Sequence, residues 1–178
     1  MKKLLAEEMK RLEVEQFRCA KKCPLTIVLD NVRSLHNVGS VLRTADAFLI
    51  EEVIMCGITG CPPSAEIHKT ALGAEDSVSW RYVKSAVNAV SELKGKGYSV
   101  YAAEQTDSSI MLQDFKMQNG KRIAVVFGNE VRGVDDEVLK KCDGAIEIPQ
   151  FGTKHSLNVS VSAGIVIWEI ARNNLINQ

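Results

Sequence analysis

The sequence predicts an α/β protein with a mostly parallel sheet and helices on both faces. The first observation is a series of short, nearly continuous apolar segments, which are typical of strands buried on both sides. They cover residues 26–32, 52–58, 98–104, 122–128 and 145–149. The second observation is a set of segments with helical spacing of apolar residues, at 37–49, 85–97, 135–142 and 156–174. This alternation of strands and helices favours parallel strand pairing.

Length and composition indicate one globular domain. The chain has 178 residues, of which 46% are hydrophobic and 25% are charged, as is usual for soluble domains. No apolar run reaches the roughly 18 residues of a membrane span, so no membrane association is predicted. Lys and Arg number 22 and Asp and Glu also 22. This neutral balance counts against a general nucleic-acid binder, but it leaves room for a local basic patch.

The N-terminal segment differs from the rest. Residues 1–24 are predicted to form a helical extension, and residues 25–178 the main domain. Residues 1–22 hold seven basic and four acidic side chains, which suits either a solvated helix face or an RNA contact. Pro24 is expected to end the helix. The apolar residues at near-helical spacing are Leu5, Met9, Leu12 and Phe17.

The five cysteines indicate reduced thiols in a cytoplasmic protein, because they are odd in number and sparse. Cys19 and Cys23 have the spacing of a zinc pair, but no second pair of Cys or His follows at a suitable distance. No metal site is therefore predicted.

Polar clusters follow three of the predicted strands, at residues 30–37, 128–133 and 149–158. In parallel sheets, ligands bind beyond the carboxyl ends of the strands, so these clusters mark a candidate site. Asn37 is expected to cap the helix that carries Arg43, which is either a surface residue or a ligand for phosphate or carboxylate. Ser156 is expected to cap the last helix, with Asn158 in its first turn.

Familiar catalytic patterns are missing from the sequence. It contains no G-x-x-x-x-G-K-[ST] phosphate loop, no G-x-S-x-G elbow and no G-x-G-x-x-G dinucleotide motif. Its three histidines lack the spacing of metal ligands. A site made of Arg, Glu, Ser and Asn suits positioning and electrostatic stabilisation. The residues alone therefore indicate a ligand-binding α/β domain, with transferase activity as one option.

Together, the three clusters resemble the motifs of the SpoU/TrmH family of RNA ribose 2′-O-methyltransferases, which belong to the SPOUT superclass. The first matches N-x-G-x-x-x-R-x-A between Asn37 and Ala45, and the second matches residues 126–130 with Gly133 in place. The third matches Ile148 and Pro149, Gly152, and residues 156–160. The resemblance spans roughly residues 25–172. It implies a C-terminal trefoil knot, S-adenosylmethionine as cofactor, an RNA substrate and a two-fold homodimer.

The resemblance also implies roles for individual residues. Arg43 would hold a phosphate and orient the 2′-hydroxyl, Glu130 would orient Arg43, and Gly128 would leave room for the cofactor. The expected cofactor-binding residues are Ala103, Glu104, Gly128, Ile148 and Leu157. The expected catalytic residues are Asn37, Arg43, Glu130, Ser156 and Asn158. The chemistry would need no metal.

Two departures from the family pattern stand out. Val131 and Arg132 separate the motif glutamate from Gly133, and Gln150 replaces the usual Met. The sequence shows no separate N-terminal RNA-binding domain, which favours tRNA as substrate over rRNA. Two other functions stay open: a catalytically silent RNA-binding protein, and a transferase acting on a small molecule.

The last predicted helix carries apolar residues on more than one face, which favours a homodimer. These residues are Val159, Val161, Ile165, Val166 and Trp168. Alternatively, the helix expected at 1–22 covers the second face within one chain.

Overall fold

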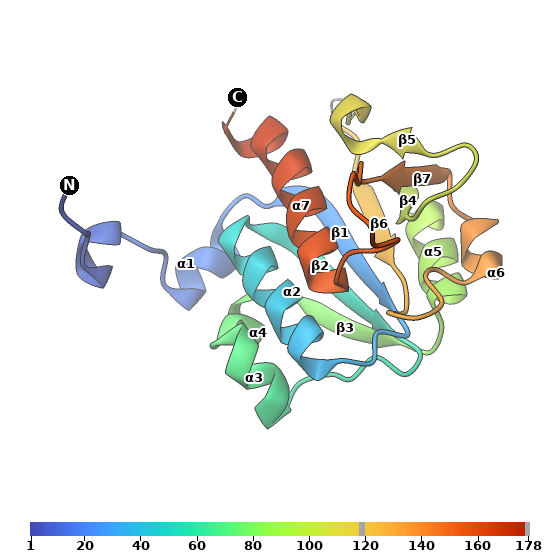
Figure 1. The fold of residues 1–178 in the computed structure, drawn as a ribbon. Helices are drawn as coiled ribbons and strands as arrows, with labels where there is room; N and C mark the ends of the chain where they lie inside the picture. Colours follow the sequence, from blue (N-terminus) through green and yellow to red (C-terminus); the bar gives the residue numbers. More distant parts are fainter. Residues whose placement is uncertain (118–119, 177–178) are drawn as a thin grey trace.

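A parallel sheet of seven strands forms the centre of the computed structural model, which describes residues 1–117 and 120–176 (Figure 1). The spatial order is β3-β2-β1-β6-β4-β7-β5, and every neighbouring pair is parallel. The strands are β1 (Cys23–Asp30), β2 (Ile50–Cys56), β3 (Trp80–Val83), β4 (Ser99–Ala103), β5 (Ile110–Met111), β6 (Ile123–Phe127) and β7 (Gly144–Glu147). The predicted parallel sheet is therefore confirmed, and each predicted strand overlaps an observed one.

Helices cover both faces of the sheet because its buried strands alternate apolar side chains between two cores. In β6, Ile123, Val125 and Phe127 enter one core, and Ala124 and Val126 enter the other. The first core is covered by α1 (Val14–Cys19), α2 (Leu35–Ala47), α3 (Ala65–Ala71), α4 (Ala74–Ser77) and α7 (Val159–Ala171). The second is covered by α5 (Ala86–Gly95) and α6 (Asp136–Leu139) (Figure 1).

Two of the predicted helix starts need correction. Ser34, not Asn37, caps α2, and its hydroxyl accepts a hydrogen bond from the Asn37 N–H at 3.3 Å. Asn158, not Ser156, caps α7, and its side chain accepts from the Ser160 N–H at 2.9 Å. Asx and Ser side chains serve equally well as caps, so the sequence alone did not distinguish neighbouring candidates. The last helix continues as a π-helical turn over Arg172–Ile176.

The prediction of a continuous N-terminal helix is wrong. Only a 3₁₀ turn, η1 (Ala6–Met9), and the short helix α1 form, and Lys10 between them adopts a φ of 47°. Leu5, Met9 and Leu12 are exposed, whereas Phe17 is buried. A segment this short, without an apolar surface to pack against, gains too little free energy to form one continuous helix. β1 begins at Cys23, so Pro24 lies inside a strand rather than after a helix.

Four short elements were not predicted from the sequence: α3, α4, and the edge strands β3 and β5. Each is seven residues or shorter, which is too short for a periodic pattern to stand out. Within the described residues, no helix is long and apolar enough to cross a lipid bilayer.

Candidate active site

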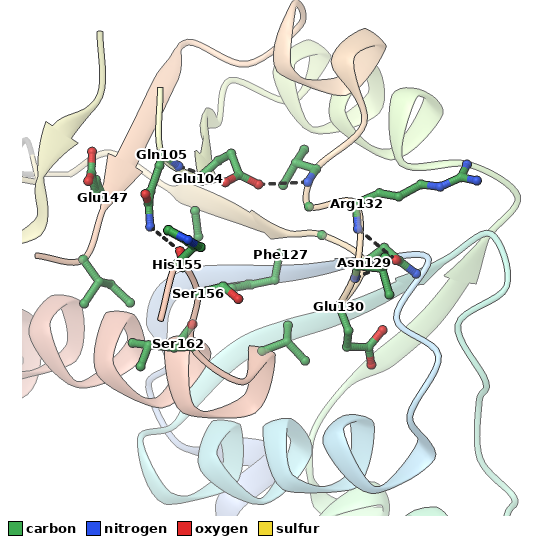
Figure 2. A pocket seen from close by; sticks show the side chains of 18 of the residues that line it. Glu104, Gln105, Phe127, Asn129, Glu130, Arg132, Glu147, His155, Ser156 and Ser162 are labelled. Carbon is green, nitrogen blue, oxygen red and sulfur yellow. Dashed lines mark hydrogen bonds between the residues drawn. The ribbon is translucent and has the colours of Figure 1, made fainter. Parts of the chain in front are cut away.

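A cavity of about 730 Å³ lies at the carboxyl ends of β4, β6 and β7 (Figure 2). Its walls come from three chain segments that follow these strands and from the start of α7. All five residues predicted to hold the cofactor line it: Ala103, Glu104, Gly128, Ile148 and Leu157. Three predicted catalytic residues, Glu130, Ser156 and Asn158, line it as well. The polar clusters after β6 and β7 therefore meet at one site, as the parallel sheet predicts, whereas none of residues 30–37 lines the cavity.

Glu130 joins the loop after β6 to the start of α2. One carboxylate oxygen accepts from the Arg33 N–H at 3.0 Å, and the other accepts from the Ser34 N–H at 3.0 Å and the Asn37 side-chain amide at 3.1 Å. Burial favours the neutral acid, but the hydrogen bonds from Arg33 and Ser34 outweigh it and hold the pKa of Glu130 below its ordinary value of 4.5. Glu130 is therefore an ionised anchor at neutral pH.

The same hydrogen bonds fix the orientation of the Asn37 and Asn158 side-chain amides. Together with Glu130 these amides form a chain of hydrogen bonds, the Glu130–Asn37–Asn158 relay. An ionised carboxylate only accepts, so the Asn37 amide nitrogen faces Glu130 and its oxygen faces away. That oxygen accepts from the Asn158 amide nitrogen at 3.1 Å. The Asn158 oxygen in turn accepts from the Ser160 hydroxyl at 2.7 Å. The catalytic candidates on the three motifs are thus linked as Glu130–Asn37–Asn158, a connection that the sequence pattern does not reveal.

Arg43 lies away from this network. It borders a second, smaller hollow formed with the α1 segment, α3 and α4, and it is exposed. Its guanidinium has no hydrogen bond or ion pair with any described residue. The expected contact between Glu130 and Arg43 is therefore wrong within one chain, because Glu130 is already occupied by Arg33, Ser34 and Asn37.

Gly128 lines the cavity, and the structure adds a second reason for a glycine there. A Cβ added there would lie 2.1 Å from the Gly133 carbonyl carbon and 2.2 Å from the Val134 nitrogen. The chain's own backbone therefore already demands glycine at this position, whether or not a ligand is bound. Gly133 has a φ of 70°, and a Cβ there would meet the Glu104 carboxylate at 2.2 Å. The two glycines let the loop after β6 fold back on itself beside the cavity.

Gly128→Ala is accordingly expected to destabilise the fold as well as weaken cofactor binding. Overpacking against backbone costs about 1–3 kcal/mol, so the melting temperature should fall by about 5 °C. Gly152→Ala is the matched control, because no atom lies within 4 Å of its added Cβ. Thermal unfolding and calorimetry with S-adenosylmethionine measure both effects. A Gly128→Ala variant with the melting temperature of the parent would contradict the backbone clash.

Several residues at the site were missed from the sequence. Asn129 accepts from the N–H groups of Val131 and Arg132, at 2.9 and 3.2 Å, and so shapes the loop after β6. Its amide donates to the Asn31 carbonyl at 2.8 Å, which ties this loop to the one after β1. Asn next to Gly is a known signal for such a side-chain turn. The amide of Gln105 donates to the His155 carbonyl at 3.0 Å (Figure 2). No sequence pattern predicts this contact.

The cavity suits a cationic ligand of moderate size. Its lining includes the carboxylates Glu104, Glu130, Asp136 and Glu147, against the single guanidinium of Arg132. A volume of this order fits a nucleoside-sized ligand. The described residues hold no group of three or more His, Cys, Asp or Glu side chains placed to bind a metal ion. A nucleoside with a positive charge, such as S-adenosylmethionine, matches this lining.

Comparison with known proteins identifies RNA-modifying enzymes that are similar to this chain. The chain is 35% identical over 169 residues to a tRNA (guanosine(18)-2′-O)-methyltransferase of Thermus thermophilus, covering 94% of this chain and 84% of that protein. The TrmH/SpoU tRNA modifying enzyme of A. aeolicus superposes with a TM-score of 0.80 at 26% identity, over 92% of this chain and 83% of that one.

An AdoMet-bound rRNA methyltransferase of Sinorhizobium meliloti has a TM-score of 0.79 at 26% identity, over 89% of this chain and 60% of that one. The model of the SpoU rRNA Methylase family matches residues 24–168, which include all three motifs. The chain therefore belongs to the SpoU rRNA Methylase family.

Proposed function

We propose that the protein is an S-adenosylmethionine-dependent RNA methyltransferase that modifies a ribose 2′-hydroxyl, with tRNA as the favoured substrate. The observation that carries this proposal is the Glu130–Asn37–Asn158 relay at the edge of the cavity. It places polar groups of three separate motifs at one point beside a pocket of nucleoside size. The match to the Thermus tRNA enzyme extends over most of both chains, which supports tRNA over rRNA.

Bound in this cavity, S-adenosylmethionine would supply an electrophilic methyl group whose bonding electrons return to sulfur when the 2′-oxygen attacks. Ala103, Gly128, Ile148 and Leu157 would hold it, and Glu104 would form a wall. Glu104 is itself fixed, because its carboxylate accepts from the N–H groups of Gln105 and Val134, at 2.9 and 3.1 Å.

The polar residues would position the RNA. Asn158 and Ser156 orient the 2′-hydroxyl, and Asn37 holds Asn158 in place. Glu130 is ionised, but its two oxygens already accept three hydrogen bonds, so it positions Asn37 rather than taking the proton. An arginine side chain does not act as a base in proteins, so Arg43 would stabilise the developing negative charge on the oxygen. The hydroxyl proton leaves to solvent.

We further propose a two-fold homodimer, which would bring Arg43 of one subunit to the cavity of the other. Support comes from an exposed apolar row on α7, formed by Val161, Ile165 and Trp168. The N-terminal segment does not cover this row. Trp168 packs edge-on against Phe48 at the end of α2, with ring centroids 5.6 Å apart, so the row adjoins the helix that carries Arg43.

Trp168→Glu is expected to give a species near the chain mass of 19.6 kDa, whereas the parent should have about twice that mass. In a two-fold interface, the new carboxylate of one subunit would be buried near the same carboxylate of the other, without a positive charge to pair with. Light scattering at micromolar concentration measures the mass. Ile58→Glu is the control. The Ile58 side chain follows β2 rather than lying on α7, and its exposed fraction is 66%, against 47% for Trp168. Equal masses for the parent and Trp168→Glu would refute this interface.

Three finer assignments complete the proposal. A trefoil knot at the C-terminal end is supported by the chain path, because residues 148–158 run from β7 along the cavity to α7, which packs against α2 (Figure 1). Residues 1–24 would be an extension of the catalytic domain at 25–178. A cytoplasmic location is supported by five free cysteines, none of them in a disulfide.

Incubation with methyl-labelled S-adenosylmethionine and either unfractionated tRNA or rRNA tests the function. The expected result is label in a 2′-O-methylated nucleoside after complete nuclease digestion, with tRNA preferred. Cofactor binding without transfer to either RNA would refute the proposal and favour a silent RNA-binding protein.

A further inference from the structure

The eight arginines of the chain divide into two groups. Arg18, Arg81, Arg122 and Arg172 form ion pairs with carboxylates. The side chains of the other four have no ion pair or hydrogen bond with the described residues: Arg11, Arg33, Arg43 and Arg132. An unpaired guanidinium is free to bind an anion, and its planar fork suits phosphate. Two of these four, Arg33 and Arg132, belong to the loops that meet at Glu130.

Hydrogen bonds fix the backbones of these two arginines beside the site. The Arg33 N–H donates to Glu130 at 3.0 Å, and the Arg132 N–H donates to Asn129 at 3.2 Å. Both side chains are exposed. Arg132 lines the cavity, and Figure 2 shows its side chain extending outward from the cavity wall, so its guanidinium lies at the rim. Each guanidinium is thus an exposed cation whose backbone is anchored next to the proposed ribose site.

Electrostatics explains why cations are needed there. Glu130 is ionised and accepts hydrogen bonds from the N–H groups of Arg33 and Ser34. These N–H groups at the start of α2 are therefore not available to bind a phosphate. A polyanion approaching this carboxylate is repelled unless nearby cations offset the charge. The chain as a whole has a formal net charge of zero, so no overall field attracts RNA. The attraction must be local.

We propose that Arg33 and Arg132 are positioning residues that hold the two phosphates flanking the target ribose, one on each side. This inference rests on the proposed function, because it assigns the RNA backbone to the rim of the same site. The two arginines start from different loops, after β1 and after β6, which meet at the Glu130 carboxylate. A strand held at both phosphates presents its 2′-hydroxyl to Asn158 and Ser156.

The test uses Arg33→Ala, Arg132→Ala and the double variant, with unfractionated tRNA. For each arginine removed, KM for tRNA should rise about 10-fold, the worth of one charge-assisted hydrogen bond. The logarithm of the association constant for tRNA falls linearly with the logarithm of the salt concentration. The magnitude of this slope should decrease by about 0.7 for each arginine removed. The kcat should change less than about threefold, because neither group touches the reacting atoms. Arg132→Lys should restore the salt slope, because it keeps the charge.

Lys121→Ala is the control. Lys121 is an exposed cation without an ion pair in the described structure, and it lies before β6, at the end of the sheet opposite the cavity. It should leave KM, kcat and the salt slope unchanged. Calorimetry with S-adenosylmethionine should give the same affinity for all variants, which separates an RNA effect from damage to the cavity.

The outcomes separate this inference from the proposed function. If the parent methylates tRNA and the double variant keeps its KM and salt slope, Arg33 and Arg132 do not hold phosphates. If the parent binds S-adenosylmethionine but transfers no methyl group to any RNA, the proposed function fails, and this inference fails with it.

Discussion

Arg43→Ala is expected to lower the rate of methyl transfer by about 100-fold, the usual effect of removing one positioned donor from a transition state. Affinity for S-adenosylmethionine should stay within about twofold of the parent, because Arg43 lies outside the cavity. Single-turnover transfer to tRNA measures the first quantity and calorimetry the second. Transfer within a few-fold of the parent would make Arg43 a surface residue.

A mixed dimer tests whether Arg43 acts on the neighbouring subunit. Co-expression with two affinity tags yields dimers with Arg43→Ala in one subunit and Glu130→Gln in the other. If Arg43 acts across the interface, one site carries both substitutions and the other carries neither, so about half of the parent activity should return. If Arg43 acts within its own chain, both sites are damaged and the mixed dimer stays inactive. The two homodimers, each expected to be inactive, are the controls.

The sheet was largely predictable because its strands are buried on both faces. Runs of Val, Ile and Leu such as those of β1 and β6 are typical of strands covered on both sides. The N-terminal segment was mispredicted for the opposite reason. Leu5, Met9 and Leu12 have helical spacing, but the described residues offer them no core, and spacing alone does not supply one. The edge strands β3 and β5 are too short and too exposed to leave a pattern.

Within the site, the positions were more predictable than the contacts. Parallel strands bring their carboxyl ends together, so the gathering of Glu130, Ser156 and Asn158 follows from topology. Their hydrogen bonds depend on backbone N–H groups, and Arg33 and Ser34 hold Glu130 through atoms that every residue except proline possesses. No choice of side chain reveals such a bond. The distance of Arg43 from Glu130 was also hidden, because a motif shows spacing along the chain and not the face of the helix.

Glu130→Gln is expected to lower kcat by at least about 100-fold, because it disturbs the relay from its starting point. The carboxylate accepts three hydrogen bonds from Arg33, Ser34 and Asn37. A glutamine amide would turn an NH₂ group toward at least one of these donors. Asn37 then loses its fixed direction, and Asn158 loses the acceptor that orients it. Single-turnover transfer at saturating tRNA and S-adenosylmethionine isolates this loss from changes in binding.

The difference in free energy of unfolding between the parent and Glu130→Gln should become smaller as the pH is lowered. The pKa of Glu130 is lower in the folded chain than its ordinary value of 4.5, so its stabilising contribution is fully present above that pH. It is lost as the pH falls through the folded value, where the carboxylate takes up a proton and becomes nearly isosteric with glutamine. Urea unfolding at pH 7 and at pH 4 should therefore show the larger gap at pH 7. A gap that is constant with pH, together with undiminished kcat, would mean that the charge of Glu130 anchors neither the loop nor the relay.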